Sequence, residues 1–325
     1  MFADDTTLLA SGKNLVELFN FVNEQLHLIC TFFRTNRLAL HPKKTQYILF
    51  TKSQDAKSTN LSLYLNNNHP NTVDDVHLKI PITRVQGSEN DPAIKFLGIF
   101  IDPNNDFKYH VGTVAKKLST ALYFMRTARQ YLTKKSLTFL YYSLFHSHLI
   151  YGIQLWSCCT QNLITKLFKL QKKAIRIING SKYNSHTESL FKKCKILPLP
   201  SLIEFFKIQF MQQYVRGHLP VSFNEVWITL EARRQNKNVE YLLRNSENFY
   251  VPLSRLYILD RQPYFSFPKV WEQFKEENIK IIRDKIQFNF KLKEYMLGKL
   301  NENFVCDRLL CPHCHLRGDT MSDSE

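Results

Sequence analysis

The chain begins Met1-Phe-Ala-Asp-Asp-Thr-Thr-Leu-Leu-Ala10. Two adjacent carboxylates, Asp4 and Asp5, precede the β-leaning run Thr6–Ala10, and Ser11-Gly12 after it predicts a strand followed by a turn. Carboxylate oxygens suit Mg²⁺, and a pair of such ions can stabilise the attacking and leaving oxygens of nucleotidyl transfer. An isolated Asp-Asp pair is more often a pair of solvated turn carboxylates, so the metal hypothesis depends on the rest of the chain.

The residues after this opening predict a small α+β region. Asn14, with Glu17 three residues later, is typical of a helix start, and apolar residues at helical spacing predict a helix to about Phe33. Gln46–Thr51 and Phe96–Asp102 are predicted strands, the second ending in a strong turn signal. We expect this region to end near residue 111.

From Val114 the apolar residues recur at helical spacing. Helices are predicted over Val114–Met125, within Thr133–Trp156, and over Leu163–Ile178 before Asn179-Gly180. Ser185 with Glu188, and Ser201 with Glu204, predict the starts of two more. The expected fold class is therefore α+β, with an α+β region at 1–111, a helical region at 112–216, an uncertain mixed region at 217–300 and a Cys/His-containing tail at 301–325.

Composition favours a polyanionic partner. The 325 residues include 44 Lys and Arg against 28 Asp and Glu, a net charge of +16, and such a surplus suggests nucleic acid or an anionic surface. The longest apolar stretch, Leu137–Trp156, is interrupted by polar residues and fails as a membrane span. Seven cysteines, without a recognisable signal peptide, predict an intracellular protein of the nucleus or cytoplasm, neither secreted nor membrane-bound.

Four sequence boxes occur in an order that is typical of one family. Phe2-Ala-Asp-Asp-Thr6 resembles the [YF]-A-D-D box, and Asn36-Arg-Leu-Ala-Leu-His-Pro-Lys-Lys-Thr45 resembles N-x-L-x-L-N-x-x-K-T, with His41 in place of Asn. Phe96-Leu-Gly-Ile-Phe-Ile-Asp102 resembles the F-L-G strand that follows. The fourth box comprises helical segments at 140–152 and 170–178. Over residues 2–215 the chain thus resembles the C-terminal part of a non-LTR (LINE-type) retrotransposon reverse transcriptase.

The resemblance implies a truncated palm at 1–111, a thumb-like region at 112–216, and RNA-directed DNA synthesis on an RNA template and DNA primer with dNTP. Asp4 and Asp5 would bind two Mg²⁺ ions, and Lys44 would lie near the nucleotide phosphates. Leu97 and Gly98 would shape the primer grip. Lys44 could instead be a solvent-exposed loop lysine, and Gly98 could mark a bulge.

One departure concerns a third carboxylate, which in this family comes from a strand far upstream. Only three residues precede Asp4. We therefore expect the isolated chain to be inactive as a polymerase, either as a fragment or as a decayed copy. The alternative is a non-catalytic nucleic-acid-binding protein derived from a decayed or domesticated element. An RNase H-like nuclease within 217–300 has no supporting set of spaced acidic residues.

The predicted helix Leu163–Ile178 has two faces. Its predicted core stripe is Leu163, Leu167, Leu170, Ala174 and Ile177. Its predicted basic row is Lys166, Lys169, Lys173 and Arg176, which spans about 15 Å. Such a row suits a phosphate backbone, although a solvated helix face has the same pattern. Further basic residues could extend the row: Lys116, Lys117, Arg126 and Arg129.

Two further patterns concern aromatic residues and the tail. Phe205, Phe206, Phe210 and Tyr214 recur at helical spacing, which favours core packing over base stacking. In the tail, Cys306, Cys311, Cys314 and His315 have the ligand types and number of a structural Zn²⁺ site. Because His315 adjoins Cys314, reduced thiols without a metal are the alternative.

Overall fold

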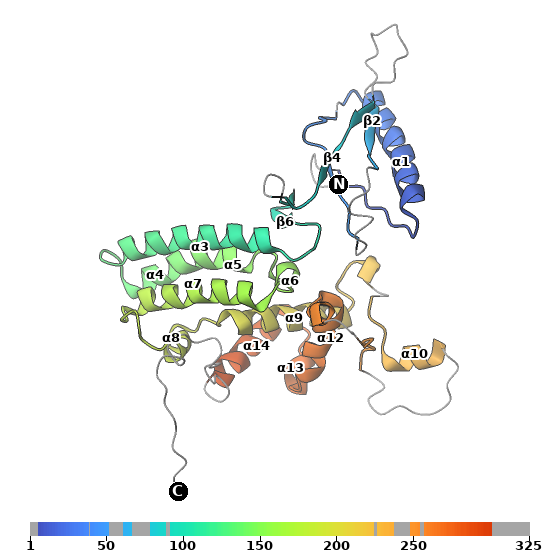
Figure 1. Cartoon of the computed structure of the whole chain (residues 1–325). Coiled ribbons are helices and arrows are strands. Elements are labelled where there is room, and N and C mark those ends of the chain that lie inside the picture. Colours follow the sequence, from blue (N-terminus) through green and yellow to red (C-terminus); the bar gives the residue numbers. More distant parts are fainter. Residues whose placement is uncertain are drawn as a thin grey trace. The chain divides into compact units, whose positions relative to one another are not determined.

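The computed structural model contains helices and a few short strands, consistent with the coarse α+β expectation (Figure 1). The residues described are 6–38, 40–51, 61–66, 79–88, 92–223, 226–236, 248–253 and 257–300. The chain divides into two compact units, Met1–His110 (unit 1) and Val111–Glu325 (unit 2), and each is described by itself. In the described part of the chain, no helix is long and apolar enough to cross a membrane.

Unit 1 begins with helix α1, Leu15–Thr35. The side-chain oxygen of Asn14 accepts a hydrogen bond from the backbone N–H of Val16 at 3.0 Å, and its amide donates to Glu17 at 3.0 Å. The Asn14 side chain thus satisfies a helix N–H that has no partner within the helix. The predicted start of this helix is confirmed.

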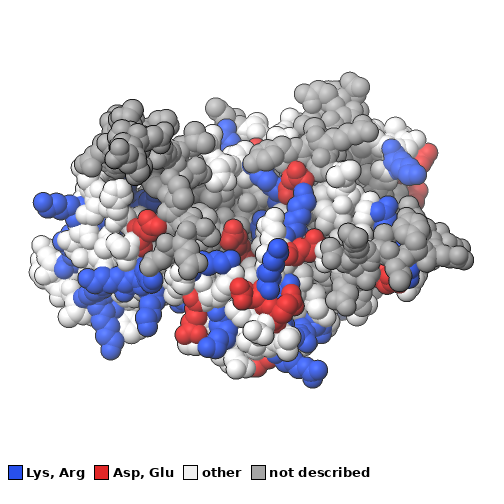
Figure 2. All heavy atoms as spheres, turned by 90° about the horizontal axis from the view of Figure 1, so that it is seen from below, with Lys and Arg blue, Asp and Glu red and all other residues white. Residues whose placement is uncertain are grey.

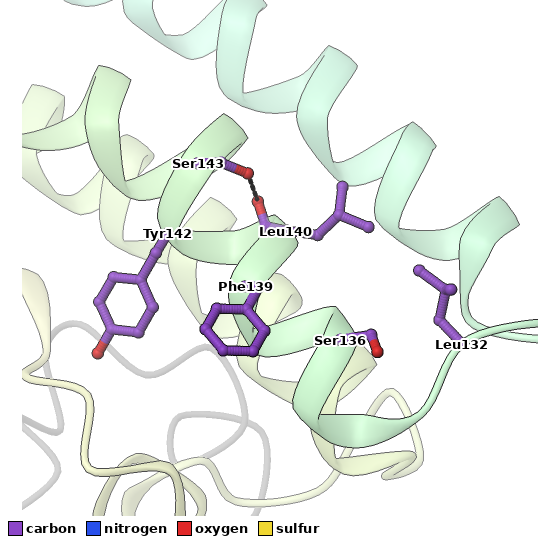
Figure 3. Close-up of a pocket in the computed structure, with 6 residues that line it drawn as sticks. All are labelled: Leu132, Ser136, Phe139, Leu140, Tyr142 and Ser143. Carbon is purple, nitrogen blue, oxygen red and sulfur yellow. Dashed lines mark hydrogen bonds between the residues drawn. The ribbon is translucent and has the colours of Figure 1, made fainter.

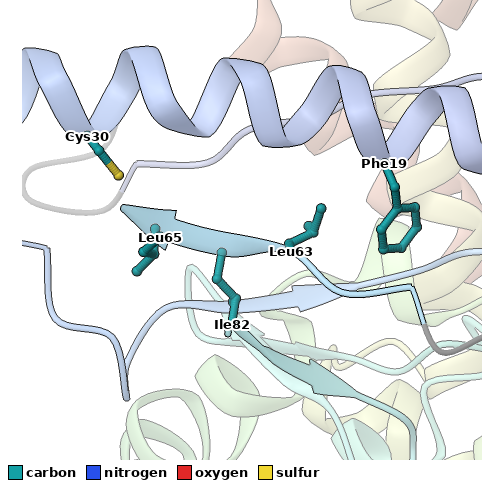
Figure 4. Packing of buried hydrophobic residues seen from close by; sticks show 5 residues of the cluster. All are labelled: Phe19, Cys30, Leu63, Leu65 and Ile82. Carbon is teal, nitrogen blue, oxygen red and sulfur yellow. The ribbon is translucent and has the colours of Figure 1, made fainter. Parts of the chain in front are cut away.

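The strands of unit 1 are short and form three separate pairs. Their bounds are β1 (Gln46–Ile48), β2 (Tyr64–Asn66), β3 (Lys79–Pro81), β4 (Thr83–Val85), β5 (Ile94–Phe96) and β6 (Ile99–Ile101). β1 pairs with β4 in parallel, whereas β2 with β3 and β5 with β6 are antiparallel. Figure 4 shows the core beneath α1, where Phe19 and Cys30 of α1 meet Leu63, Leu65 and Ile82.

Two predictions for unit 1 are wrong. Thr6–Ala10 is not a strand, since no described segment pairs with it and Leu9 is 88% exposed. Phe96–Asp102 is not one strand either. The chain turns at Leu97-Gly98, so that Phe96 pairs with Ile99 in a hairpin. Both turn residues have positive φ, 45° and 84°, as in the primed turns that match the twist of a two-residue hairpin.

Unit 2 is mainly helical in its described residues, with one isolated antiparallel β-bridge between Thr229 and Phe249. After α3 (Lys108–Ala128), whose first residues belong to unit 1, the chain forms α4 (Lys134–Leu140), the π-helix η1 (Tyr141–His146), α5 (Ser147–Ile150), α6 (Ile153–Trp156), α7 (Gln161–Asn179), α8 (Glu188–Cys194) and α9 (Leu199–Val215). The remaining elements are η2 (Val221–Phe223), α10 (Leu230–Asn236), α11 (Tyr257–Asp260), α12 (Pro263–Gln273), α13 (Glu277–Lys280) and α14 (Lys285–Lys299).

The single helix predicted within Thr133–Trp156 is interrupted twice. At η1 the hydrogen bonds change to π-helical spacing, and at Gly152 the backbone becomes left-handed, with φ 62°. The π-helical turn allows Tyr141 and Phe145 to be fully buried and stacked, with ring centroids 5.3 Å apart. Three consecutive residues between these rings remain exposed: Tyr142, Ser143 and Leu144.

The core stripe predicted for α7 is partly wrong. Leu167, Ala174 and Ile177 are buried, but Leu163 and Leu170 are only half-buried. The buried face also contains Ile164, Gln171, Ile175 and Ile178. The predicted stripe followed apolar residues at spacings of three and four from Leu163. It missed the buried face because that face includes Gln171, a polar residue that is fully buried.

Gln171 connects three segments of unit 2. Its amide donates hydrogen bonds to the hydroxyl of Tyr141 at 3.1 Å and to the carbonyl of Leu197 at 3.0 Å. Its side-chain oxygen accepts from the backbone N–H of Leu199 at 2.7 Å. Since all of these groups are buried, the Gln171 side chain satisfies polar atoms that have no access to water.

Residues 217–300, predicted only as a mixed region, contain helices that pack on α9, including α12 and α14 (Figure 1). Met211, Trp227 and Phe267 form a buried cluster against which Phe210 and Tyr214 pack, which confirms core packing for the last two rings. The two capping predictions are wrong: α8 begins only at Glu188, and α9 begins before Ser201, at Leu199 after Pro198.

Candidate nucleic-acid interface

Helix α7 has clear ends and no acidic residue. It begins after Thr160, whose backbone is extended, and ends at Asn179, followed by Gly180 in the left-handed conformation with φ 67°. The N–H of Gly180 bonds back to the carbonyls of Arg176 and Ile177, as is common where glycine ends a helix. The predicted end at Asn179-Gly180 is confirmed.

The basic side chains of α7 lie opposite its buried face. Lys166 and Lys169 are exposed, and Lys172 and Lys173 are half-buried. The ammonium group of Lys172 lies 4.5 Å from the ring centre of Phe168, a cation–π contact. With 3.6 residues per turn, these lysines form one continuous basic face, which we call the α7 basic face.

Arg176 has a structural role that the sequence did not indicate. Its Nε donates a hydrogen bond to the carbonyl of Ser185 at 2.9 Å, and its guanidinium lies 6.0 Å from the ring centre of Tyr183. The side chain is half-buried. Arg176 therefore fixes the segment between α7 and α8, and its predicted contact with phosphate stays a prediction.

Two cations from outside α7, Lys134 and Arg129, lie at its C-terminal end. The ammonium group of Lys134 at the start of α4 donates to the side-chain oxygen of Asn179 at 2.8 Å. A guanidinium nitrogen of Arg129 lies 3.4 Å from where a Cβ at Gly180 would be. Positive charge at this end is favourable because the last carbonyls of a helix carry partial negative charge.

The remaining predicted basic residues lie on α3. Lys116, Lys117 and Arg126 are exposed on this helix, which Figure 1 shows running alongside α7 with α4 and α5 between them in the view. The structure thus presents them to solvent on the same helical unit as the α7 basic face. Whether they bind the same nucleic acid stays a prediction.

The sequence holds a stronger signal that residue-by-residue reasoning missed. Between Asp106 and Glu188 there is no acidic residue at all, while the same stretch carries 13 of the 44 Lys and Arg residues. This acid-free segment covers all of α3, α4, η1, α5, α6 and α7. Figure 2 shows blue side chains gathered at the lower left of the face that it presents.

No protein-family model, curated protein or solved structure matches the chain.

The predicted polymerase residues that the structure describes lie in unit 1. Lys44 is exposed, and its backbone N–H donates to the carbonyl of His41 at 3.0 Å in a tight turn before β1. Leu97 and Gly98 form the tip of the β5–β6 hairpin, with Leu97 40% exposed. A leucine at φ 45° is unusual, and such strained positions concentrate at functional sites.

The predicted metal ligands cannot be placed. Asp4 and Asp5, proposed for Mg²⁺, and all four proposed Zn²⁺ ligands in the tail lie outside the described residues. Within the residues that are described, no three His, Cys, Asp or Glu side chains are grouped as a metal site. The structure therefore supplies no geometry for either metal.

His146, in the π-helix η1, is a titratable group that the sequence reasoning did not single out. Burial lowers the pKa of His146 to about 4, with a smaller contribution from the positive charge of Lys293. Its Nδ1 atom is buried, and no described group forms a hydrogen bond with it. The imidazole packs at 5.2 Å on the ring of Tyr142, so it is neutral and part of the packing at neutral pH.

Proposed function

We propose that this chain is part of an RNA-directed DNA polymerase of the non-LTR retrotransposon type, and that its acid-free helices hold the primer–template duplex. The observation that carries the proposal is the acid-free segment, folded so that α7 turns its apolar side inward and its lysines outward. A folded surface with cations and no carboxylates favours a polyanion and provides no acidic group to repel it.

The α7 basic face suits a phosphate backbone for a further reason. Lys166, Lys169 and Lys173 recur every three or four residues, so their charges extend about 10 Å along the helix. Lysine acts as a point charge towards phosphate and needs no fixed hydrogen-bond geometry. The buried opposite face, tied through Gln171, keeps this row rigid.

The polymerase assignment is supported by the sequence boxes of unit 1. In the intact enzyme, Asp4 and Asp5 would bind Mg²⁺, which would stabilise the attacking and leaving oxygens of nucleotidyl transfer. Lys44 would contact the phosphates of the incoming nucleotide. The exposed β5–β6 hairpin would contact the primer through Leu97, where Gly98 permits close approach of the backbone.

A second function, nucleic-acid binding without catalysis, is favoured by one observation. The basic interface lies in unit 2, whereas every predicted polymerase residue lies in unit 1. Binding by the helices therefore needs none of the catalytic residues. Asp4→Ala separates the two functions: in the full-length polymerase it abolishes primer extension and leaves duplex binding unchanged, whereas a purely binding protein extends no primer at all.

The binding claim is tested with a charge-matched pair of triple variants. The first replaces Lys166, Lys169 and Lys173 by Gln. The second replaces three exposed lysines that lie among acidic residues near the C-terminal end of unit 2: Lys275, Lys285 and Lys291. The affinity of each for an RNA–DNA hybrid is measured by fluorescence anisotropy over a range of salt concentrations.

Each lost phosphate contact lowers the slope of log K against log[salt] by about 0.9 on duplex DNA. The α7 variant is therefore expected to lose about 2 to 3 from the slope, while the control variant keeps the wild-type slope. Equal slopes for the two variants would show that the α7 basic face is an ordinary solvated surface.

A further inference from the structure

An aromatic groove lies along the α4–η1 segment of unit 2, and its smaller part lies between this segment and the C-terminal end of α3. Two adjoining depressions form it, one of about 680 Å³ around Ser136, Phe139 and Tyr142, and one of about 440 Å³ around Phe124 and Tyr131. Leu140 lines both depressions and joins them.

The rings that line this groove are exposed to solvent, both on its α3 side and on its α4 side. Phe124 and Tyr131 of the α3 side are 52% and 79% exposed, and Phe139 of α4 is 65% exposed. Figure 3 shows the rings of Phe139 and Tyr142 projecting to the same side of their helix, while Leu140 points toward Leu132. Exposing large apolar rings to water is unfavourable, so a cluster of exposed rings indicates a surface that binds a partner.

The π-helix η1 presents one of these rings, Tyr142. Because Tyr141 and Phe145 are both fully buried, the residues between them face outward, including Tyr142 beside Phe139. π-Helical turns are frequent at functional sites. Tyr141 and Phe145 thus lie on the buried side of η1, and Tyr142 lies on its exposed side.

The positive charges beside the groove favour a negatively charged ligand. Lys117 is exposed on α3 two helical turns before Phe124, and Lys135 is exposed on α4 four residues before Phe139, so each lies on the same helix face as the ring it precedes. The whole groove lies inside the acid-free segment. Exposed rings between cations, without carboxylates, are the arrangement by which proteins stack successive bases of a single strand.

We propose that the aromatic groove binds unpaired nucleotides of a single-stranded nucleic acid, with bases stacked on Phe139 and Tyr131 and phosphates near Lys117 and Lys135. This site deepens the function proposed for the α7 basic face and rests on it. The duplex would contact the lysines of α7, whereas an unpaired template or displaced strand would enter the groove.

The test compares two probes that differ only in their bases: a short oligo(dT) and an abasic oligodeoxynucleotide of the same length. Wild-type protein is expected to bind oligo(dT) more tightly, since base–ring stacking adds to the phosphate contacts. Phe139→Ala with Tyr131→Ala should weaken oligo(dT) binding by about fivefold or more and leave abasic binding unchanged. Phe290→Ala, at a 58% exposed ring on α14, is the matched control and should change neither affinity.

Each other outcome separates this site from the proposed function. If wild-type protein binds oligo(dT) and the abasic probe equally, the groove does not bind bases and its assignment is overturned. The α7 basic face could still bind duplex in that case, as the salt slope of the α7 lysine variant would show. A ring variant that changes the oligomeric state in sedimentation, with no loss of oligo(dT) affinity, would assign the groove to a second copy of the chain and also overturn it. Unchanged circular dichroism of the ring variants establishes that they are folded.

Discussion

Replacing Gln171 by Leu should destabilise unit 2 strongly, because it removes the partner of three buried groups at once. The hydroxyl of Tyr141, the carbonyl of Leu197 and the N–H of Leu199 lie 3.1, 3.0 and 2.7 Å from the Gln171 side chain. A buried polar group without a partner costs about 1–3 kcal/mol. Rotation of the Tyr141 hydroxyl and burial of the new leucine offset part of this cost, which leaves about 3 kcal/mol.

The loss is measurable by urea unfolding followed through tryptophan fluorescence. All three tryptophans, Trp156, Trp227 and Trp271, belong to unit 2, so the signal reports on that unit. Thermal melting gives a second measure: for a unit of this size, 1 kcal/mol of stability corresponds to about 2–4 °C in melting temperature. Gln171→Leu should therefore lower the melting temperature by about 6–12 °C. Gln154→Leu is the matched control, since Gln154 makes a single long bond of 3.3 Å to Phe206, and should cost under about 1 kcal/mol.

A double-mutant cycle identifies the cause. Tyr141→Phe removes one of the three partners and should cost about 1 kcal/mol alone, but less in the Gln171→Leu background, where the hydroxyl is already unpaired. Additive effects of the two changes, or a neutral Gln171→Leu, would refute the view that this glutamine satisfies buried groups.

Three further predictions concern single residues. The pKa of His146 is about 4 in the folded state and about 6.5 in the unfolded state. The stability that neutral His146 contributes is therefore complete above pH 6.5 and is lost as the pH falls towards 4. Between pH 7 and pH 5, urea unfolding should show that the wild type loses about 2 kcal/mol more stability than His146→Gln. Gly180→Ala should destabilise unit 2 by about 1 kcal/mol, because Gly180 has a φ of 67°. Gly112→Ala should stabilise unit 2 by about 0.5–1 kcal/mol, because Gly112 lies inside α3 with free space for a Cβ. Melting curves in which Gly180→Ala is the more stable variant would contradict this backbone explanation. Leu97→Asn should relieve the turn strain and slow amide hydrogen exchange across β5–β6, and faster exchange would show that the leucine side chain stabilises the hairpin.

Local signals in the sequence were reliable where one residue decides the structure. Asn14 marks the start of α1 through its own hydrogen bonds, and Gly180 marks the end of α7 because it readily adopts positive φ. The Ser185 and Ser201 motifs failed because other residues stand at the helix starts: Thr187 precedes α8, and Pro198 precedes α9. Their spacing alone does not determine which residue caps a helix.

Other features depend on contacts between distant residues. Thr6–Ala10 has strand-forming residues, but a strand needs a neighbour, and none is present among the described segments. The turn at Leu97 was hidden because leucine seldom adopts positive φ. The buried face of α7 was misplaced because Gln171 looks like a surface residue until Tyr141 and Leu197 are seen beside it.

The candidate site was only partly visible in the sequence. The lysines of α7 were predicted, and their exposure or half-burial opposite a buried face is what the structure shows. The structural role of Arg176 and the aromatic groove were not predicted, since both arise from side chains of separate elements. The acid-free segment is visible in the sequence, but it is recognised by the lack of Asp and Glu over a long stretch and not by a short motif.

Lysine footprinting tests the central claim most directly. The chain is acetylated briefly with and without an RNA–DNA hybrid, and the modification of each lysine is read by mass spectrometry. We predict that the hybrid protects Lys166, Lys169 and Lys173 on α7, while Lys275 and Lys285 stay equally reactive. Protection of both sets to the same degree, or of neither, would contradict nucleic-acid binding by the α7 basic face.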